Sequence, residues 1–211
     1  MKRPTTAIFL ACALAAAATV SGEMTFDREQ LLLSELDRMT TVSLPGCVPA
    51  WEVGAPSVPI ATAQLVVPQD MRVTGVTVDR FEAEVVEGEF DVYPTQQPRP
   101  LSDPGPFEYT PPDPQYYGAF EYPGSIAVNA HQGSMFGYNI ASVFVAPVRY
   151  NADEKKLIFH PRVSFTLQLE SADLGYLEVG NRSPESVRRI EDHLAALVLN
   201  PGDISTWAPG K

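Results

Sequence analysis

The clearest hydrophobic pattern in the chain is an alternation of apolar and polar side chains over residues 157–170. Apolar residues, Pro161 among them, occupy the odd positions from 157 to 169, and mostly polar residues occupy the even ones. A period of two is that of a β-strand with one buried face. The segment 134–150 has a similar pattern, and the run 151–155 between the two is typical of a turn. We therefore predict an antiparallel hairpin of strands 134–150 and 157–169.

Residues 26–44 fit two patterns. An apolar spacing of three to four residues would suit one face of a helix. Two strand-like runs, 31–36 and 40–44, separated by Asp37 and Arg38, instead suit a hairpin. We prefer the hairpin because β-branched residues in the second run disfavour a helix. Further strand-like runs follow at 62–67, 72–78 and 81–93.

Residues 94–123 interrupt this β pattern. Prolines recur throughout the segment, and aromatic residues lie between them. Proline donates no backbone N–H, so a strand ladder cannot run through such a segment. Its aromatic content distinguishes it from a disordered linker. We predict a long, extended or polyproline-like loop that is pinned by its aromatic side chains.

The last forty residues change to a helical period. Ser183 and Pro184 suit the N-cap and the first position of a helix, and an apolar stripe follows with helical spacing. The predicted helix spans about 184–199. The patterns together predict a mainly β fold: an antiparallel β-sandwich, jelly-roll-like, with a long proline-rich loop and a short C-terminal helix.

The N-terminus has the composition of a secretion signal. Lys2 and Arg3 precede an apolar run over 7–20, and small residues up to Gly22 suit cleavage by a signal peptidase. We predict a signal peptide at 1–22, a rival reading being a lipoprotein signal at Cys12. No other segment is apolar enough to span a membrane. The expected location is therefore secreted or periplasmic.

Charge and chemistry narrow the function. The formal net charge of −11 disfavours nucleic acid as a partner. After signal cleavage Cys47 is the single cysteine, and it has no catalytic motif around it. His131, His160 and His193 show no metal-ligand spacing. We therefore predict no catalytic residue, no metal site and no cofactor.

Five short motifs occur in a fixed order along residues 44–170. They are Gly54-x-Pro56-x-x-Pro59, Ala63-Gln64-Leu65-Val66-Val67-Pro68, Tyr93-Pro94-Thr95-Gln96-Gln97-Pro98, Tyr122-Pro123-Gly124 and Pro147-x-x-Tyr150-Asn151. In this order they resemble the N-terminal propeptide domain of the gingipain-type (family C25) cysteine peptidases.

The resemblance implies a non-catalytic β-sandwich that lies against a peptidase, blocks its active-site cleft and assists its folding. The implied partner is a cysteine peptidase catalytic domain, encoded in cis or acting in trans. The expected division is a signal at 1–22, a propeptide-like sandwich at 23–170 and a linker with the helix at 171–211. No peptidase domain follows Lys211 in this sequence. A truncated or split precursor is our preferred explanation, and a free-standing inhibitor is the other.

The proline-rich loop is the candidate inhibitory segment. Arg99 lies between Pro98 and Pro100, so it resembles a basic residue before a scissile bond that the following proline would protect from cleavage. The alternative is a secreted β-sandwich that binds glycans or a cell-surface protein through the aromatic residues of the loop. A solvated loop arginine is the simpler explanation of Arg99.

Overall fold

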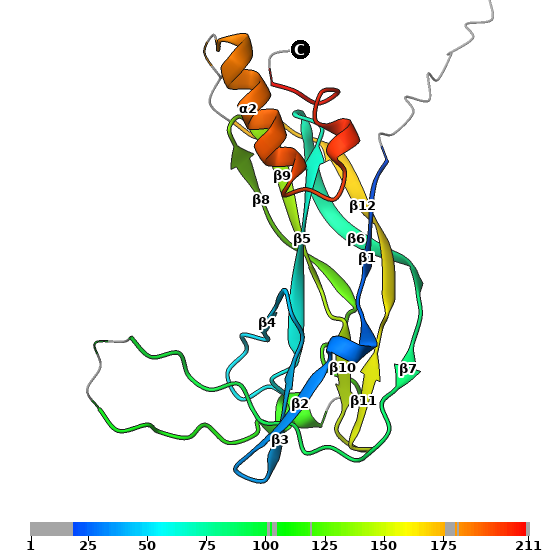
Figure 1. The fold of residues 1–211 in the computed structure, drawn as a ribbon, viewed down its shortest axis with the longest axis vertical. Coiled ribbons are helices and arrows are strands. Elements are labelled where there is room, and N and C mark those ends of the chain that lie inside the picture. The colour runs from blue at the N-terminus through cyan, green and yellow to red at the C-terminus, as the bar shows by residue number, and fades with distance from the viewer. Residues whose placement is uncertain are drawn as a thin grey trace, which may run out of the picture.

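Two antiparallel sheets form the body of the molecule (Figure 1). The computed structural model describes residues 19–100, 102, 105–118, 120–175, 180 and 182–209. The first sheet has the strand order β1 (Val20–Thr25), β12 (Arg162–Ser171) and β6 (Met71–Phe81). The second has the order β4 (Cys47–Pro49), β5 (Pro59–Val67), β9 (Tyr138–Val145) and β8 (Ala127–Met135).

The alternating apolar residues of both sheets form a shared core. Leu65 on β5, Val143 on β9 and Phe165 on β12 have no exposed surface and belong to one buried cluster. This arrangement confirms the predicted mainly β, antiparallel sandwich. The period-two pattern in this part of the sequence arises because every second side chain of β12 faces the second sheet.

Smaller elements lie at one end of the sandwich. A three-stranded sheet contains β10 (Val148–Asn151), β11 (Lys156–Phe159) and β7 (Glu84–Val85). The hairpin of β2 (Leu32–Leu36) and β3 (Met39–Ser43) confirms the preferred reading of that segment. Its two turn residues, Asp37 and Arg38, have φ values of 51° and 66°. Positive φ at both positions gives the turn a twist that suits an antiparallel pair. The short helices η1 (Arg28–Gln30) and α1 (Pro114–Tyr117) complete this end.

The prediction of one strand over 134–150 is wrong. Phe136 and Gly137 have φ values of 51° and 80° and make a tight turn that separates β8 from β9. A phenylalanine is unusual in this conformation, so its apolar side chain hid the turn in the sequence. A second break follows at Pro147.

The predicted hairpin with strand 157–169 is confirmed only for its inner part, where β10 pairs with β11. Beyond the breaks at Pro147 and Pro161, β9 continues into the second sheet and β12 into the first. The two prolines therefore mark the points at which the chain divides between the sheets.

The predicted strand over 81–93 is also wrong. Within this segment only β7 is a regular strand after the end of β6. The Val86 N–H donates to the Leu157 carbonyl at 2.9 Å, and the Phe90 N–H donates to the Lys155 carbonyl at 2.9 Å. Gly88 between them has a φ of 124° and breaks the ladder. This glycine bends the segment away from the small sheet, so residues after β7 bond to the sheet only at isolated positions.

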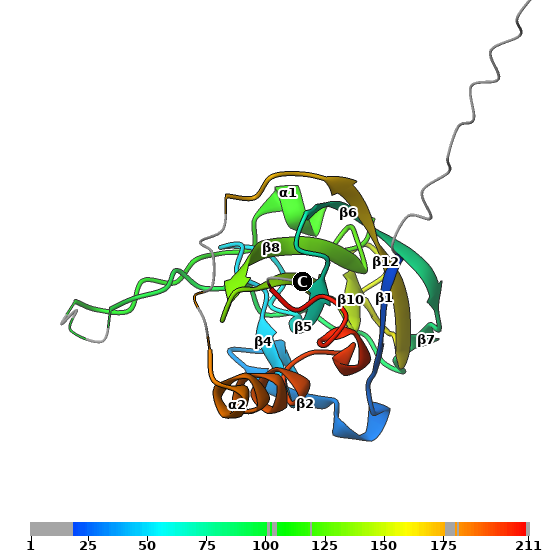
Figure 2. The same cartoon turned by 90° about the horizontal axis from the view of Figure 1, so that it is seen from above.

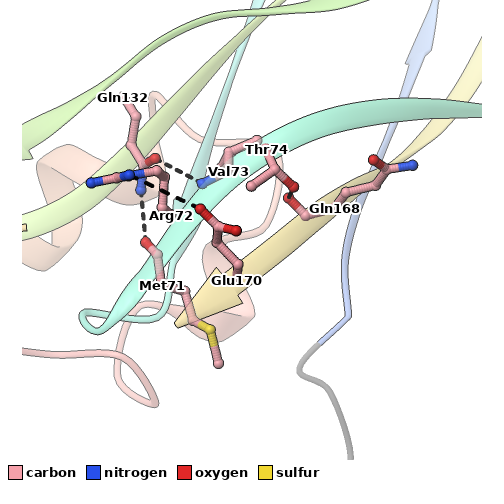
Figure 3. A network of polar contacts seen from close by, with 7 residues as sticks. All are labelled: Met71, Arg72, Val73, Thr74, Gln132, Gln168 and Glu170. Carbon is pink, nitrogen blue, oxygen red and sulfur yellow. Dashed lines mark hydrogen bonds and ion pairs between the residues drawn. The ribbon is translucent and has the colours of Figure 1, made fainter. Parts of the chain in front are cut away.

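A corner between the two sheets is held by side-chain amides (Figure 3). Gln132 reaches from β8 to β6, where it accepts the Val73 N–H at 2.8 Å and donates to the Met71 carbonyl at 2.8 Å. The fully buried Asn139 on β9 donates to the carbonyls of Met71 at 2.9 Å and Pro68 at 2.7 Å. These bonds satisfy backbone groups that no strand neighbour reaches.

The C-terminal helix α2 (Pro184–Ala195) covers part of the outer face of the second sheet. Ser183 caps it, its Oγ accepting the Ser186 N–H at 3.2 Å. The helix ends at Ala195 rather than near residue 199, because the following residues pair with β5. Leu199 N–H donates to the Gln64 carbonyl at 2.8 Å, and the Asn200 side chain bonds both backbone groups of Val66. The 3₁₀ turn η2 (Pro201–Asp203) follows.

The predicted signal peptide lies mainly outside the described residues, which begin at 19. Val20, Ser21 and Gly22, at its expected end, form the first half of β1 and pair with β12. Cleavage after Gly22 stays a prediction that N-terminal sequencing of the exported protein would check. No helix in the described part of the chain is both long enough and apolar enough to cross a membrane.

Candidate functional site

The proline-rich segment forms an arm that projects sideways from the body. Figures 1 and 2 show its two limbs running out and back beside each other. We define the arm as residues 94–113, with an outgoing limb at 94–100 and a return limb at 105–113. Neither limb contains a regular strand. The predicted long loop is therefore present, and contacts other than a β-ladder hold its limbs together.

Gly54 closes the base of the arm. Its N–H donates to the Thr95 carbonyl at 2.8 Å, and its carbonyl accepts the Asp113 N–H at 2.9 Å. The φ of Gly54 is +82°, and a Cβ at this position would lie 3.0 Å from the Asp113 Cβ. Only glycine fits both constraints without strain. This is the structural reason for the glycine of the Gly54-x-Pro56-x-x-Pro59 motif.

Gln96 joins the middle of the two limbs. Its Oε1 accepts the Thr110 N–H at 2.8 Å, and its Nε2 donates to the Thr110 carbonyl at 3.0 Å. The same Nε2 donates to the Pro94 carbonyl at 2.8 Å. One side-chain amide thus takes the place of a strand residue between limbs whose prolines lack N–H groups.

Arg99 joins the limbs nearer the tip. Its Nη1 donates to the Pro106 carbonyl at 2.8 Å and its Nη2 donates to the Gly105 carbonyl at 2.7 Å. The guanidinium carries its donors in a rigid fork, which suits two successive carbonyls. Pro98 and Pro100 on either side of it are exposed. The predicted site residue therefore lies on the projecting part of the arm, partly exposed, with its charged group turned toward the return limb.

Aromatic residues pin the arm to the body, as predicted. The Tyr109 ring lies 6.0 Å from that of Tyr93, and its hydroxyl contacts the Met39 Sδ at 3.6 Å. The Tyr117 hydroxyl donates to the Val92 carbonyl at 2.5 Å. Burial raises the pKa of Tyr117, so this hydroxyl remains a donor at neutral pH. Phe107, in contrast, is 61% exposed on the return limb.

Two of the sequence motifs meet where the chain continues after the arm. Tyr122 and Tyr150 exchange backbone hydrogen bonds of 2.8 and 2.7 Å, and the Tyr122–Pro123 peptide is cis. Arg149 donates through Nε to the Pro123 carbonyl at 2.9 Å and forms an ion pair with Glu121. The Tyr122-Pro123-Gly124 and Pro147-x-x-Tyr150-Asn151 motifs therefore form one structural unit that holds the returning chain.

The other candidate chemical groups lie apart from one another. Cys47 lies in β4, and partial burial raises the pKa of its thiol to about 11. The thiolate is the nucleophilic form, and this pKa keeps it scarce at neutral pH. His131 is exposed on β8, His160 is buried after β11, and His193 lies on α2. Within the described residues no three His, Cys, Asp or Glu side chains gather as metal ligands would.

Sequence reasoning singled out Arg99 but missed Gln96 and Thr110 as the pair that holds the limbs together. A glutamine within a proline run was the available signal, since its amide can supply both a donor and an acceptor where the backbone supplies only an acceptor.

Comparisons with known proteins agree with this geometry. The family model Propeptide_C25 matches residues 20–176. The fold is similar to that in the "Complex of Porphyromonas gingivalis RgpB pro- and mature domains", with a TM-score of 0.65 and 18% identity over 90% of this chain and 95% of that one.

A second solved structure concerns the zymogenic latency of gingipain K from Porphyromonas gingivalis. It matches with a TM-score of 0.59 and 23% identity, over 75% of this chain and 90% of that one. A search of curated protein sequences gave no match. The family model spans the strands of the sandwich, the arm and all five sequence motifs. The chain therefore belongs to the C25 propeptide family.

Proposed function

We propose that this domain keeps a gingipain-type cysteine peptidase latent and assists its folding, without catalytic chemistry of its own. The observation that carries the proposal is the arm: a narrow, proline-rich projection held at three levels by Gly54, Gln96 and Arg99. A preorganised projection loses little conformational entropy when it enters a cleft. Membership in the C25 propeptide family supplies the partner class.

The arm is suited to resist the enzyme that it would block. Its limbs are joined through side chains, so cutting one bond near the tip would leave the Gln96 clasp and the base in place. Pro98 and Pro100 flank Arg99, and a proline after a basic residue hinders cleavage there. A fragment that stays in position continues to fill the cleft.

Arg99 is the residue that we propose to enter the specificity pocket of a peptidase that prefers basic residues. In the unbound arm its guanidinium binds the Gly105 and Pro106 carbonyls. Entry into an acidic pocket would exchange these two neutral acceptors for a carboxylate, which forms the stronger, charge-assisted hydrogen bonds.

The test is inhibition in trans. The chain without its predicted signal is titrated against the C25 peptidase of the source organism, and hydrolysis of a fluorogenic substrate is followed. We expect stoichiometric inhibition. Arg99→Ala should weaken it at least tenfold, whereas Arg80→Ala, the same loss of charge on an exposed residue of β6, should leave it unchanged.

A folded chain that leaves the peptidase fully active would contradict the proposed function. Undiminished inhibition by Arg99→Ala would remove Arg99 from the pocket while leaving the latency proposal in place.

A further inference from the structure

The hairpin beside the arm exposes an unusual amount of apolar surface. All five residues of β2 are exposed, and Leu32 and Leu36 keep 58% and 46% of their surface accessible. The two leucines lie on the same face of the strand because side chains alternate. Met39, opposite Leu36 on β3, extends this face. A two-stranded hairpin that covers so little of its own apolar surface is marginal by itself, and it is suited to contact something else.

The outer edge of β2 is also open. In an antiparallel pair, opposed residues alternate between hydrogen-bonded and non-bonded pairs. Thr40, opposite Glu35, directs its N–H to the Asp91 carbonyl at 2.6 Å and its carbonyl to the Tyr93 N–H at 2.8 Å, away from β2. Glu35 and Leu33 therefore direct their own backbone groups away from β3.

No residue of the described part of the chain bonds to that edge. β2 pairs with β3 alone, and none of the backbone hydrogen bonds outside the regular elements involves Leu33 or Glu35. Open edges are commonly protected by charged residues, proline or a bulge, and β2 has a single charged residue, Glu35, and neither a proline nor a bulge. Four backbone groups on two residues thus remain available to a further strand.

The hairpin and the arm form one continuous surface. Thr40 is hydrogen-bonded to the residues that lead into the outgoing limb, and Met39 contacts the Tyr109 hydroxyl on the return limb. Tyr109 is itself 43% exposed. Any partner that encloses the arm therefore meets β3 at the base of the projection, and the open edge of β2 lies one strand beyond it.

We propose that the open edge of β2 receives an extended segment of the C25 peptidase domain as an added strand. Backbone groups of that segment pair with Leu33 and Glu35, and apolar residues at alternate positions on it pack against Leu32 and Leu36. This inference rests on the proposed function and adds a second contact to it. The arm fills the cleft, and the hairpin anchors the domain beside it.

Binding and inhibition are measured separately to test the anchor. Affinity is measured against the source organism's C25 peptidase with its catalytic cysteine replaced, and inhibition against the active enzyme. The double variant Leu32→Ser, Leu36→Ser should weaken binding at least tenfold, since two half-exposed leucines lose their apolar contact. Leu197→Ser is the control, because Leu197 is 44% exposed and follows α2, a helix that lies at the opposite end of the molecule from β2 (Figure 1).

The backbone part of the proposal has its own pair of variants. Glu35→Pro removes the outward N–H. An edge strand tolerates proline at a position whose N–H points away from the sheet. Glu35→Gln removes the same charge and keeps the N–H. We expect Glu35→Pro to weaken binding severalfold and Glu35→Gln to bind like the wild type. Circular dichroism and thermal unfolding establish that each variant is folded.

Three results would overturn the inference. Binding by the double leucine variant within twofold of wild type would show that the hairpin is not an anchor. A dimer of the isolated chain that the leucine variant abolishes would assign the edge to a second copy. A wild-type chain that neither binds nor inhibits would contradict the proposed function and the anchor together, whereas the first of these results would contradict the anchor alone.

Discussion

At the scale of single residues, His160 is a buried titratable group whose surroundings disfavour its charge. It is 1% exposed, its Nδ1 lies 2.8 Å from the Glu82 carbonyl, and its Nε2 has no hydrogen-bond partner among the described residues. Burial lowers its pKa below the ordinary value, and the nearby Arg149 adds to the effect, while the Glu82 carbonyl and Glu121 oppose it. The folded protein therefore favours neutral His160.

We predict that this histidine makes the domain less stable in acid. Because the pKa of His160 is lower in the folded state, the unfolded chain binds more protons as the pH falls below about 6.5. Stability is fully present above that pH and is lost as the pH falls through the folded-state pKa.

Chemical denaturation between pH 7.5 and 5 measures this loss. His160→Gln keeps a side-chain donor for the Glu82 carbonyl and cannot titrate, so its stability should depend less on pH over this range. His193→Gln, at an exposed position of α2, is the control and should follow the wild type. Equal pH dependence in all three proteins would contradict the role of His160.

At the scale of elements, the arm shows how a segment rich in proline acquires a defined shape. Its limbs cannot form a ladder, so Gly54, the Gln96 amide and the Arg99 guanidinium supply the cross-connections one by one. Each of these three cross-connections depends on a single residue. The arm is therefore sensitive to single substitutions that leave the sandwich unaffected.

Gln96→Ala should loosen the arm without unfolding the domain. It removes three hydrogen bonds of a partly buried amide, each contributing about 0.5–1.5 kcal/mol to local order. Limited proteolysis should then cut within 94–113 several times faster, with little change in the thermal unfolding temperature. Gln97→Ala is the control, because Gln97 is exposed and adjacent. Equal cleavage of the two variants would show that the Gln96 contacts do not order the arm.

At the scale of the whole molecule, the two sheets depend on each other. β9 and β12 are joined through β10 and β11, and their apolar faces share one core. At the open corner, β8 and β6 have no ladder between them, and Gln132 supplies the connection (Figure 3). The chain itself thus connects the two sheets through β10 and β11, and the Gln132 hydrogen bonds connect them at the corner of β8 and β6.

Gln132→Ala should destabilise the entire sandwich. It leaves the Val73 N–H without its acceptor, while the Met71 carbonyl keeps the Asn139 amide, at a cost of about 1–3 kcal/mol of unfolding free energy. Gln168→Ala removes only the exposed hydrogen bond of this β12 glutamine to the Thr77 hydroxyl, at 2.9 Å, and should cost less, about 0.5 kcal/mol. Urea unfolding of both variants measures the difference. A Gln132→Ala protein as stable as Gln168→Ala would show that the Gln132 hydrogen bonds do not contribute to the free energy of unfolding.

The sequence by itself determined the local features of this protein. The period of two in 157–170, the turn at Asp37 and Arg38, and the proline-rich loop each depend on residues that are neighbours in the chain. The order of the five motifs indicated the family for the same reason, since motif order is a property of the sequence alone.

The tertiary structure decided how distant segments meet. The turn at Phe136 and Gly137 was hidden because an apolar side chain in a left-handed conformation has no local signature. The false strand at 81–93 had the right alternation but found no partner strand for most of its length. The contacts of Gly54 with Asp113 and of Gln96 with Thr110 are likewise set by packing, as is the outer edge of β2, which pairs with no strand in the described part of the chain. Local patterns determine which residues form strands, whereas pairing and exposure depend on residues far away in the chain, and that information exists only once the chain has folded.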